Sequence, residues 1–545
     1  MNRLSLWCLT ALTTLGVAYG KAAEVSEKFV IVHCESPGTL TLSEDALIAP
    51  HLKVTGNIDQ RDFEALKYAT INVTRILDLT ETVIHEYTSG NSDTRMDWII
   101  DDPKKITYPA DMLPAGAFSE LRDNSISKFT RGSSTLKKLI LPASLKGFMK
   151  GAFTSYSIIT DLVVPEGSTT LRQDGKLVYS YDGSTLLAMP PAWFGDVTVA
   201  SSVTSVADGA FDAAIPASVT FTSATPPTLS EGATLSTAYI IAPTPEAYSK
   251  TFPDIDCISE LETVTLTNLQ PGELMGTLGN MGYTRKDVRG IKISGSLSPD
   301  DFNALVELPN LHAADLSEAK VECESFSTRF TIANSSIADF KFPKFSKSMI
   351  LVIDAASSLH GDLEVPDRTD VIYNYSKRFR SVTFPSTLYN LGERSFPEYN
   401  VTETLDFSQC SNMKELYLSY ATQCLTTLRL PENIESIKYI DGPVKEVNLP
   451  GSLKELYGDY WMVEKLVLPQ SLETFGMWNL PMVKEIDATE ARSLYNFNSL
   501  SHAPNLKTLD ISMCPIRTIK SLFGASSYSG SVVVSGGTRY PSISI

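Results

Sequence analysis

The chain lacks a disulfide framework and a zinc-binding pattern. Only seven cysteines occur in 545 residues, and Cys8 lies in an apolar stretch at the start of the chain. The others are scattered, without a CxxC pair, at Cys34, Cys257, Cys323, Cys410, Cys424 and Cys514. So few cysteines exclude a disulfide-stabilised scaffold. We expect most of them to be buried free thiols.

Catalytic motifs are missing as well. Neither Gly-x-Ser-x-Gly nor His-Glu-x-x-His occurs, and there is no phosphate-binding or dinucleotide-binding glycine loop. The six histidines are isolated. Asp62-Phe63 and Asp301-Phe302 fall at equivalent places, where an acidic residue is expected at the start of a helix. The acidic segment 91–102 offers oxygen ligands but no calcium-loop spacing. We therefore predict no enzyme activity, no catalytic residues, no metal site and no cofactor.

Positive charge is in short supply. Lysine and arginine total 46 against 63 aspartates and glutamates, which gives a net charge of −17. A basic surface is needed to neutralise nucleic-acid phosphates or to dock on an anionic membrane, so both partners are excluded. After the N-terminal stretch, no apolar run approaches the roughly 18–20 residues of a transmembrane helix.

The first residues predict export. Arg3 is followed by a charge-free apolar run from Leu4 to Val17, and small residues appear up to Ala23. This order is typical of a secretory signal peptide, which we assign to residues 1–23. The mature protein is expected outside the cell or on its outer surface, with the periplasm as the alternative compartment.

A seven-residue pattern that recurs along the chain determines the fold class. Leu425–Pro431, Val444–Pro450 and Val463–Pro469 each read apolar-x-x-apolar-x-apolar-Pro, with the prolines 19 residues apart. The alternation predicts a short strand, and proline ends it. Units that cannot bury their apolar residues alone must stack. The fold class is thus an α/β leucine-rich-repeat solenoid, rich in strand, with a parallel sheet on one face and irregular or short-helical arcs.

A second level of repetition divides the chain into two tandem lobes. Leu52–Phe63 parallels Ile291–Phe302, and each follows a strand and a Pro-Gly turn that resemble a cap. We predict a first lobe at 24–258, with an N-terminal cap, a hairpin insertion at 174–190 and a C-terminal cap. The second lobe, 259–545, has its own N-terminal cap and a closing tail.

Four phrases carry a family resemblance: Asp174–Pro190, Ser202–Phe211, Ala224–Leu229 and Tyr239–Tyr248. They resemble the hairpin insertion, the repeat arc and the terminal cap of the BspA-type leucine-rich-repeat family, whose members are secreted or surface proteins. The resemblance runs from about residue 25 to about 520. It implies a solenoid that binds host or matrix molecules, and it carries over no functional residue.

Charges and aromatic residues distinguish two surfaces of the second lobe. Lys445, Glu464 and Lys484 occupy one outward row, and Glu446, Lys465 and Glu485 occupy the next. Both rows alternate in sign, so we expect neighbouring strands to pair opposite charges on a self-neutralised, solvated face. Aromatic residues crowd into five turns: Tyr417, Tyr420, Tyr439, Tyr457, Tyr460, Trp461 and Trp478.

Five of these aromatic residues form the candidate binding site: Tyr439, Tyr457, Tyr460, Trp461 and Trp478. Exposed tyrosine and tryptophan suit a protein hot spot or a sugar-stacking platform, whereas buried rings would only fill space in the arcs. The leading hypothesis is an adhesin-like scaffold that binds host or matrix proteins. A glycan-binding surface protein is the alternative, and an unrecognised hydrolase is the remote one. The ligand itself is not specified.

Overall fold

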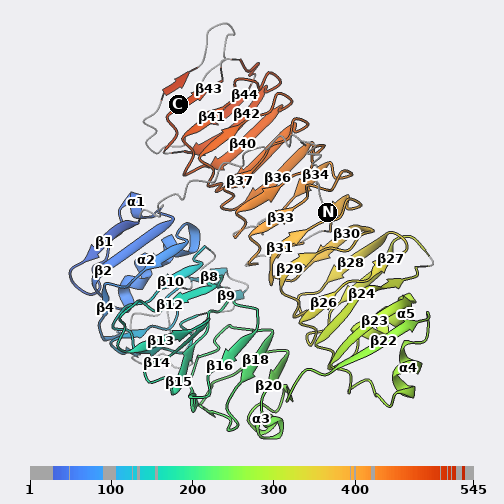
Figure 1. The fold of residues 1–545 in the computed structure, drawn as a ribbon. Helices are drawn as coiled ribbons and strands as arrows, with labels where there is room; N and C mark the ends of the chain where they lie inside the picture. Colours follow the sequence, from blue (N-terminus) through green and yellow to red (C-terminus); the bar gives the residue numbers. More distant parts are fainter. Residues whose placement is uncertain are drawn as a thin grey trace, which may run out of the picture.

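A computed structural model of the protein describes residues 29–533, apart from residues 48, 90–105, 119, 125–126, 132–134, 154–156, 324, 393–394, 398–399, 419–423, 504, 512, 517 and 523–530. The signal peptide and the acidic segment 91–102 lie outside the described residues. Strands stack in parallel, turn upon turn, and helices are few (Figure 1). The predicted solenoid is confirmed.

We call residues 30–258 the N-terminal array. It begins with the parallel sheet β1 (Val30–Cys34), β2 (His51–Ile58), β3 (Ile76–Asp78), β10 (Lys138–Ile140) and β12 (Asp161–Val163), with β4 (Thr82–Ile84) beside β2. Helices α1 (Glu44–Leu47) and α2 (Gln60–Asn72) complete this end. The next parallel sheet contains β16 (Val197–Val199), β18 (Ser218–Phe221), β20 (Tyr239–Ile241) and β21 (Asp256–Ile258), and α3 (Pro245–Thr251) precedes the last strand.

Antiparallel strands interrupt this array. Strands β13 (Leu171–Asp174), β14 (Leu177–Ser180) and β15 (Thr185–Ala188) pair antiparallel, and the sheet continues in parallel through β17 (Ser205–Val206) and β19 (Thr228–Leu229). Two further antiparallel pairs join β5 (Tyr87–Thr88) to β6 (Thr107–Tyr108) and β8 (Glu120–Asn124) to β9 (Ser127–Arg131), whereas β7 (Met112–Leu113) pairs with β11 (Gly147–Phe148) in parallel.

Residues 263–533 form what we call the C-terminal array. It opens with β22 (Thr263–Leu269), α4 (Leu274–Asn280), β23 (Gly290–Leu297), α5 (Pro299–Val306), β24 (Ala313–Val321), β26 (Asp339–Lys341) and β27 (Lys344–Phe345). The repeat face then follows through β29 (Gly361–Glu364), β31 (Phe379–Thr383), β33 (Thr404–Asp406), β35 (Thr427–Arg429) and β37 (Glu446–Val447), and through β39 (Lys465–Val467), β41 (Glu485–Asp487), β43 (Thr508–Asp510) and β45 (Ser531–Val533). The division of the chain into two lobes at 258–259 stays a prediction.

The arcs between these strands are strands themselves. We call their two parallel sheets the arc face: β25 (Thr328–Ile332), β28 (Met349–Ile353), β30 (Thr369–Asn374) and β32 (Asn390–Leu391), then β34 (Glu415–Tyr417), β36 (Ser436–Asp441), β38 (Glu455–Asp459), β40 (Thr474–Asn479), β42 (Asn496–His502) and β44 (Thr518–Leu522). The irregular or short-helical arcs that we expected are therefore replaced by a second sheet. The reason is that arc residues such as those of β38 alternate between buried and partly exposed positions, which is the period of a strand.

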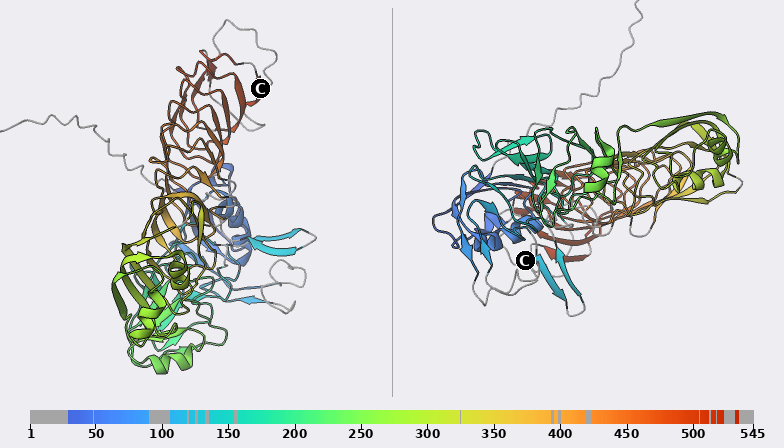
Figure 2. Two further views of the ribbon diagram at one scale, coloured as in Figure 1. Left: turned by 90° about the vertical axis from the view of Figure 1, so that its right-hand side faces the viewer. Right: turned by 90° about the horizontal axis from the view of Figure 1, so that it is seen from below.

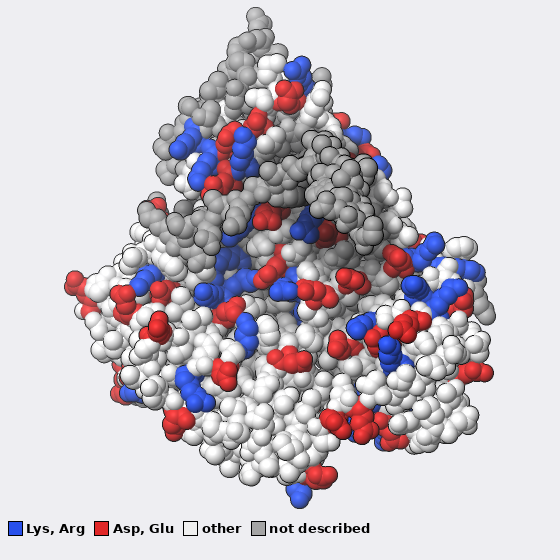
Figure 3. Space-filling model, viewed as in Figure 1, with Lys and Arg blue, Asp and Glu red and all other residues white. Residues whose placement is uncertain are grey.

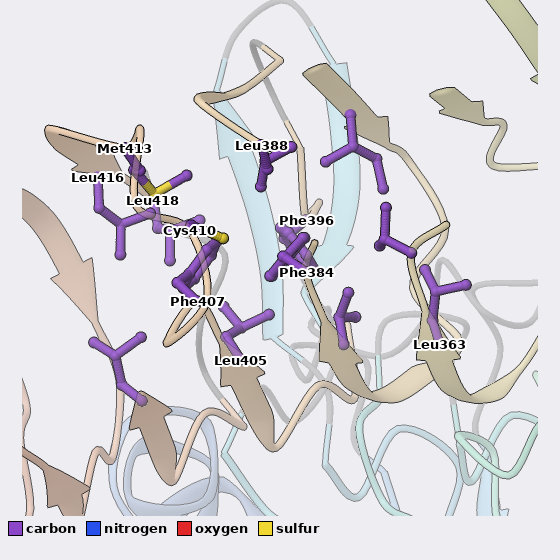
Figure 4. Close-up of a cluster of buried hydrophobic side chains, with 14 of the residues drawn as sticks. Leu363, Phe384, Leu388, Phe396, Leu405, Phe407, Cys410, Met413, Leu416 and Leu418 are labelled. Carbon is purple, nitrogen blue, oxygen red and sulfur yellow. The ribbon is translucent and has the colours of Figure 1, made fainter. Parts of the chain in front are cut away.

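The core lies between the repeat face and the arc face. One contiguous buried cluster runs through the C-terminal array from Val264 to Ile516. Phe384 and Phe407 stack within it at 4.3 Å between ring centroids, beside Cys410 and Leu405 (Figure 4). Each turn covers the apolar residues of its neighbours, as stacking of incomplete units requires.

Two alternative devices end the repeat strands. Pro431, Pro450 and Pro469 do so in the units with proline. In four other units, serine or threonine replaces the proline. The backbone N–H of this serine or threonine donates a hydrogen bond to an aspartate two residues earlier, at Asp78, Asp315, Asp406 and Asp487. Such a turn is a known local alternative to proline. Hydrogen bonds from the Ser317 hydroxyl, the Lys341 ammonium group and the Ser317 backbone N–H lower the pKa of Asp315 to about 2.

One buried aspartate holds each N-terminal cap together. Asp62 is the N3 residue of the capping box of α2, and it accepts hydrogen bonds from the backbone N–H groups of Gly38 and Leu40, at 2.7 and 2.8 Å. Asp301 has the same place in the capping box of α5 and accepts the equivalent bonds from Gly272 and Leu274, at 2.5 and 3.3 Å. The structural role predicted for these two carboxylates is confirmed.

The two arrays lie side by side and run in opposite directions (Figures 1 and 2). Contacts between them follow that order: Asp256 with Arg289 and His312, Tyr239 on His312, Phe194 with Lys377 and Arg378, and Lys137 with Glu403. Most of these residues lie at the start of a strand or just before one. The arrays therefore meet along the N-terminal edges of their repeat strands.

Candidate functional site

The repeat face is electrostatically neutralised by its own side chains. Lys465 lies 2.8 Å from Glu485 on the next strand, and Lys484 lies 3.0 Å from Glu464. Lysine, arginine and acidic side chains are likewise interspersed over the face of the molecule in Figure 3. The predicted pairing of opposite charges is confirmed for these strands, so their charges are already satisfied within the protein.

The aromatic residues predicted as a site divide between surface and core. Tyr439 and Tyr460 are 43% and 36% exposed, and Tyr457 and Trp478 are half-buried. All four lie on or beside β36, β38 and β40 of the arc face. We call Tyr417, Tyr439, Tyr457, Tyr460 and Trp478 the aromatic strip. Tyr420 lies outside the described residues.

Trp461 does not belong to this surface. Its side chain is fully buried, and the indole Nε1–H donates a hydrogen bond to the backbone carbonyl of Ile440 at 2.9 Å. A Cβ atom at Gly458 would lie 2.8 Å from that nitrogen, so the glycine leaves room for the indole. Our inclusion of Trp461 in the binding site was wrong. Its large apolar ring gains more from burial in the arc than from a place on the surface.

A β-bulge directs Tyr439 outward. Ile437 pairs with Leu456 and Ile440 with Gly458, so two residues on β36 oppose one on β38. Tyr439 is one of those two residues, and its φ of 57° is unusual for a bulky residue. Bulges re-aim side chains, and they occur often beside functional sites. The extra residue brings the Tyr439 ring into line with its neighbours on adjacent turns.

The rings of the strip contact one another across turns. Tyr417 and Tyr439 meet edge to face, with centroids 5.5 Å apart and planes at 67°. Tyr439 and Trp478 are nearly parallel, at 6.5 Å and 16°. Tyr417, which we had not included in the site, is 56% exposed. The sequence could have indicated Tyr417, because it occupies the same register position in its arc strand as Tyr457 does in β38.

Tyr457 depends on a glycine in the next turn. A Cβ atom at Gly476 would lie 2.6 Å from the Tyr457 ring, closer than side-chain atoms pack. The ring therefore lies directly over the backbone of β40. Tyr373 lies over Gly392 in the same way, with 2.1 Å to a Cβ atom there. Both glycines let a tyrosine ring lie flat on the arc face.

Two carboxylates stand at the end of the same strands. Asp441 and Asp459 are direct neighbours in the register of β36 and β38. Asp459 accepts hydrogen bonds from Nδ2 of Asn479 at 2.6 Å and from the backbone N–H of Tyr460 at 2.9 Å. Burial, and then the charge of Asp459, raise the pKa of Asp441 to about 6, and burial also raises the pKa of Asp459. We did not predict this pair from the sequence, although each aspartate follows a tyrosine of the strip by two residues.

The histidine and cysteine side chains that could take part in catalysis or metal binding were also located in the structure. His312 is buried, stacks on Tyr239 and shares Asp256 with Arg289. All six described cysteines are free thiols, and five of them are buried, as expected. Within the described residues, no group of three or more His, Cys, Asp or Glu side chains is arranged to hold a metal ion. None of the described helices combines the length and apolarity that crossing a membrane requires.

A family model described as a BspA type leucine rich repeat region matches residues 363–461 in six copies. Residues 363–461 are BspA-type leucine-rich repeats. The family resemblance predicted from the sequence is confirmed for these residues. These BspA-type repeats contain Tyr417, Tyr439, Tyr457 and Tyr460 of the aromatic strip, and both carboxylates beside it.

Two solved structures are similar to the chain. One is a leucine-rich repeat protein from Bacteroides ovatus, 14% identical, with 74% of this chain and 83% of that chain covered and a TM-score of 0.15. The other is a leucine rich cell surface protein from Faecalibacterium prausnitzii, 11% identical, with 67% and 97% covered and a TM-score of 0.18. No curated protein matches the sequence.

Proposed function

We propose that the protein is a non-enzymatic binding protein that acts outside the cell or on its surface, as an adhesin-like scaffold for host or matrix proteins. The observation that carries this proposal is the aromatic strip. Several rings with exposed or half-buried surfaces, among them Tyr417 and Tyr439, stand on successive turns of one rigid sheet. Protein interfaces are enriched in tyrosine and tryptophan anchors, because these rings supply large contact areas at low entropic cost.

The position of the strip supports a role in binding. The described contacts between the arrays end near Glu403 and Cys424, and the turns from β36 onward extend beyond the N-terminal array (Figures 1 and 2). A parallel stack of strands also holds its side chains in fixed register, so the strip is organised before a ligand arrives. The predicted signal peptide and the surface proteins of this repeat family support the proposed location.

Glycan binding is the second candidate. The observation in its favour is the nearly parallel arrangement of Tyr439 and Trp478, at 16°. Parallel rings on an exposed face offer a surface on which a sugar ring can stack. The same residues thus serve both hypotheses, and the class of ligand has to be determined by experiment.

Binding of the purified mature protein to paired arrays of extracellular-matrix proteins and polysaccharides tests the proposal. Tyr439→Ala and Trp478→Ala are measured alongside Tyr389→Ala, a matched control because Tyr389 is 52% exposed elsewhere on the same array. We expect selective protein binding that the first two variants lose and the control retains. Selective binding to polysaccharides alone would replace the leading hypothesis with the second. Binding that all three variants retain would contradict a site on the strip.

A further inference from the structure

We infer that the aromatic strip, together with Asp441 and Asp459, binds a positively charged side chain, an arginine or a lysine, in a basic segment of a protein ligand. The inference rests on the proposed function and specifies the chemistry of the ligand. Three features of the strip support it: the angles between its rings, the carboxylates at its edge and the charge of the surrounding surface.

The rings form a corner rather than a flat platform. Tyr439 is nearly parallel to Trp478 but stands at 67° to Tyr417. A sugar ring stacks best on one flat surface, whereas a cation is attracted by the face of any nearby ring, most strongly by tryptophan. Aromatic walls at steep angles are the arrangement that recognises ammonium groups. The corner therefore favours a cationic group over a sugar.

The carboxylates stand on the same side of the sheet as the rings. Side chains two residues apart on a strand point to the same face, so Asp459 accompanies Tyr457 on β38. The bulge on β36 ends before Ile440, and Asp441 lies directly opposite Asp459 in the register. Trp478 and Asn479 end β40 in the next turn. The two carboxylates thus lie beside the strip on two successive turns, and the third turn adds the neutral Asn479.

Two like charges directly opposite on neighbouring strands destabilise a sheet. Here burial, and then this repulsion, raise the pKa of Asp441, and Asn479 orients the second carboxylate by a hydrogen bond of 2.6 Å. A bound cation would relieve this repulsion and gain from both carboxylates at once. A neutral sugar hydroxyl would not relieve the repulsion between the two carboxylates. The pair is therefore matched to a positive charge.

The surroundings add to this preference. Lys438, the basic residue next to Tyr439, lies 3.2 Å from Glu455 and is neutralised by it. The chain as a whole carries a net charge of −17, which attracts basic partners and repels acidic polymers. Arginine suits the site especially well, because its planar guanidinium stacks on rings while its N–H groups bind carboxylates.

A pair of peptides tests the inference on the full mature protein. Hexa-arginine is compared with hexa-citrulline, which has the same shape without the charge, at about 0.15 M salt, where long-range attraction is screened. We expect the arginine peptide to bind at least tenfold more tightly than the citrulline peptide. Equal binding of the two peptides, or binding of neither, would overturn the inference.

Two variants and two matched controls locate the site. Asp441→Asn removes one charge with little change of shape, and Tyr439→Ala removes the central ring. We expect each to weaken binding of hexa-arginine about tenfold. Glu464→Gln makes the same charge change on the repeat face, and Tyr389→Ala removes an exposed ring elsewhere. Both controls should stay within twofold of the unaltered protein. Equal losses in Asp441→Asn and Glu464→Gln would overturn the inference, because binding would then follow net charge alone.

The result is separable from that of the proposed function. A matrix protein whose binding is lost in Tyr439→Ala but unchanged in Asp441→Asn would overturn the cationic site and leave the proposed function standing. Binding of hexa-arginine at the strip without capture of any matrix protein would support the cationic site and contradict the matrix-protein hypothesis. Circular dichroism of every variant confirms that the fold is intact.

Discussion

The indole N–H of Trp461 donates a hydrogen bond to the backbone carbonyl of Ile440, 2.9 Å away, in the buried arc beneath the aromatic strip. Trp461→Phe should lower the free energy of unfolding by about 1–3 kcal/mol, because the carbonyl loses its donor. Trp461→Ala should lower it by about 3–5 kcal/mol through the cavity that forms. Chemical denaturation measures both values. Loss of ligand binding without loss of stability would contradict the buried role.

The cap carboxylates provide a second prediction. Asp301→Ala removes the acceptor for the backbone N–H groups of Gly272, Leu274 and Ser298. We expect a loss of at least about 2 kcal/mol, because buried donors are left unsatisfied. Thermal unfolding measures the change. Asp300→Ala is the control, because the described N–H groups of the cap donate to Asp301 and not to this neighbour. An equal loss of stability in Asp300→Ala would refute the role of Asp301.

The carboxylate pair predicts a pH dependence of stability. The pKa of Asp441 is about 6 in the folded protein, above the ~3.9 of an unfolded aspartate. The folded state therefore holds a proton between about pH 4 and 6 that the unfolded state releases, and this contribution to stability is lost as the pH rises through 6. Asp441→Asn should thus stabilise the protein at pH 7, by roughly 1 kcal/mol, and have little effect near pH 4. A variant less stable at pH 7 would contradict the repulsion.

The cysteines should be unreactive in the folded protein. Burial raises the pKa of Cys410 to about 12, and Cys424 is also fully enclosed. A thiol that is not ionised and not accessible reacts slowly. We expect a maleimide reagent to modify at most the half-buried Cys257 in the native state, and all of the thiols after denaturation. A Cys410–Cys424 disulfide in non-reduced peptides would refute the prediction.

The contact between the arrays gives a further test. The Phe194 ring lies 5.6 Å from Nζ of Lys377 and 5.3 Å from the guanidinium of Arg378, measured to its centroid, and it packs beside Val401. Phe194→Ala should loosen the contact, lower the unfolding temperature by several degrees and increase the radius of gyration in X-ray scattering. Tyr181→Ala, an exposed ring on the same array, is the control. An unchanged scattering profile would argue against the contact.

Several elements followed from local patterns. The spacing of Pro431, Pro450 and Pro469 was sufficient for the repeat strands, because a period of two and a strand-ending proline are properties of adjacent residues. The pairing of Lys465 with Glu485 followed from the repeat length, since stacked turns bring equivalent positions together. Asp62 and Asp301 were recognisable from their places at helix starts.

Other elements depended on contacts that no local pattern contains. The arcs became a second sheet because neighbouring turns supply the hydrogen-bond partners. Trp461 became buried because Gly458 leaves space beneath it. The β-bulge at Tyr439 shifts the register between β36 and β38, and Asp441 meets Asp459 only through the resulting register.

The sequence by itself determined that this chain forms a stacked leucine-rich-repeat solenoid, because the same short phrase recurs in register and cannot bury its apolar residues alone. Only the tertiary structure decided which aromatic rings remain at the surface, which carboxylates face each other and how the two arrays meet. Each of these depends on the packing of residues that are distant along the chain, and periodicity carries no information about the space between them.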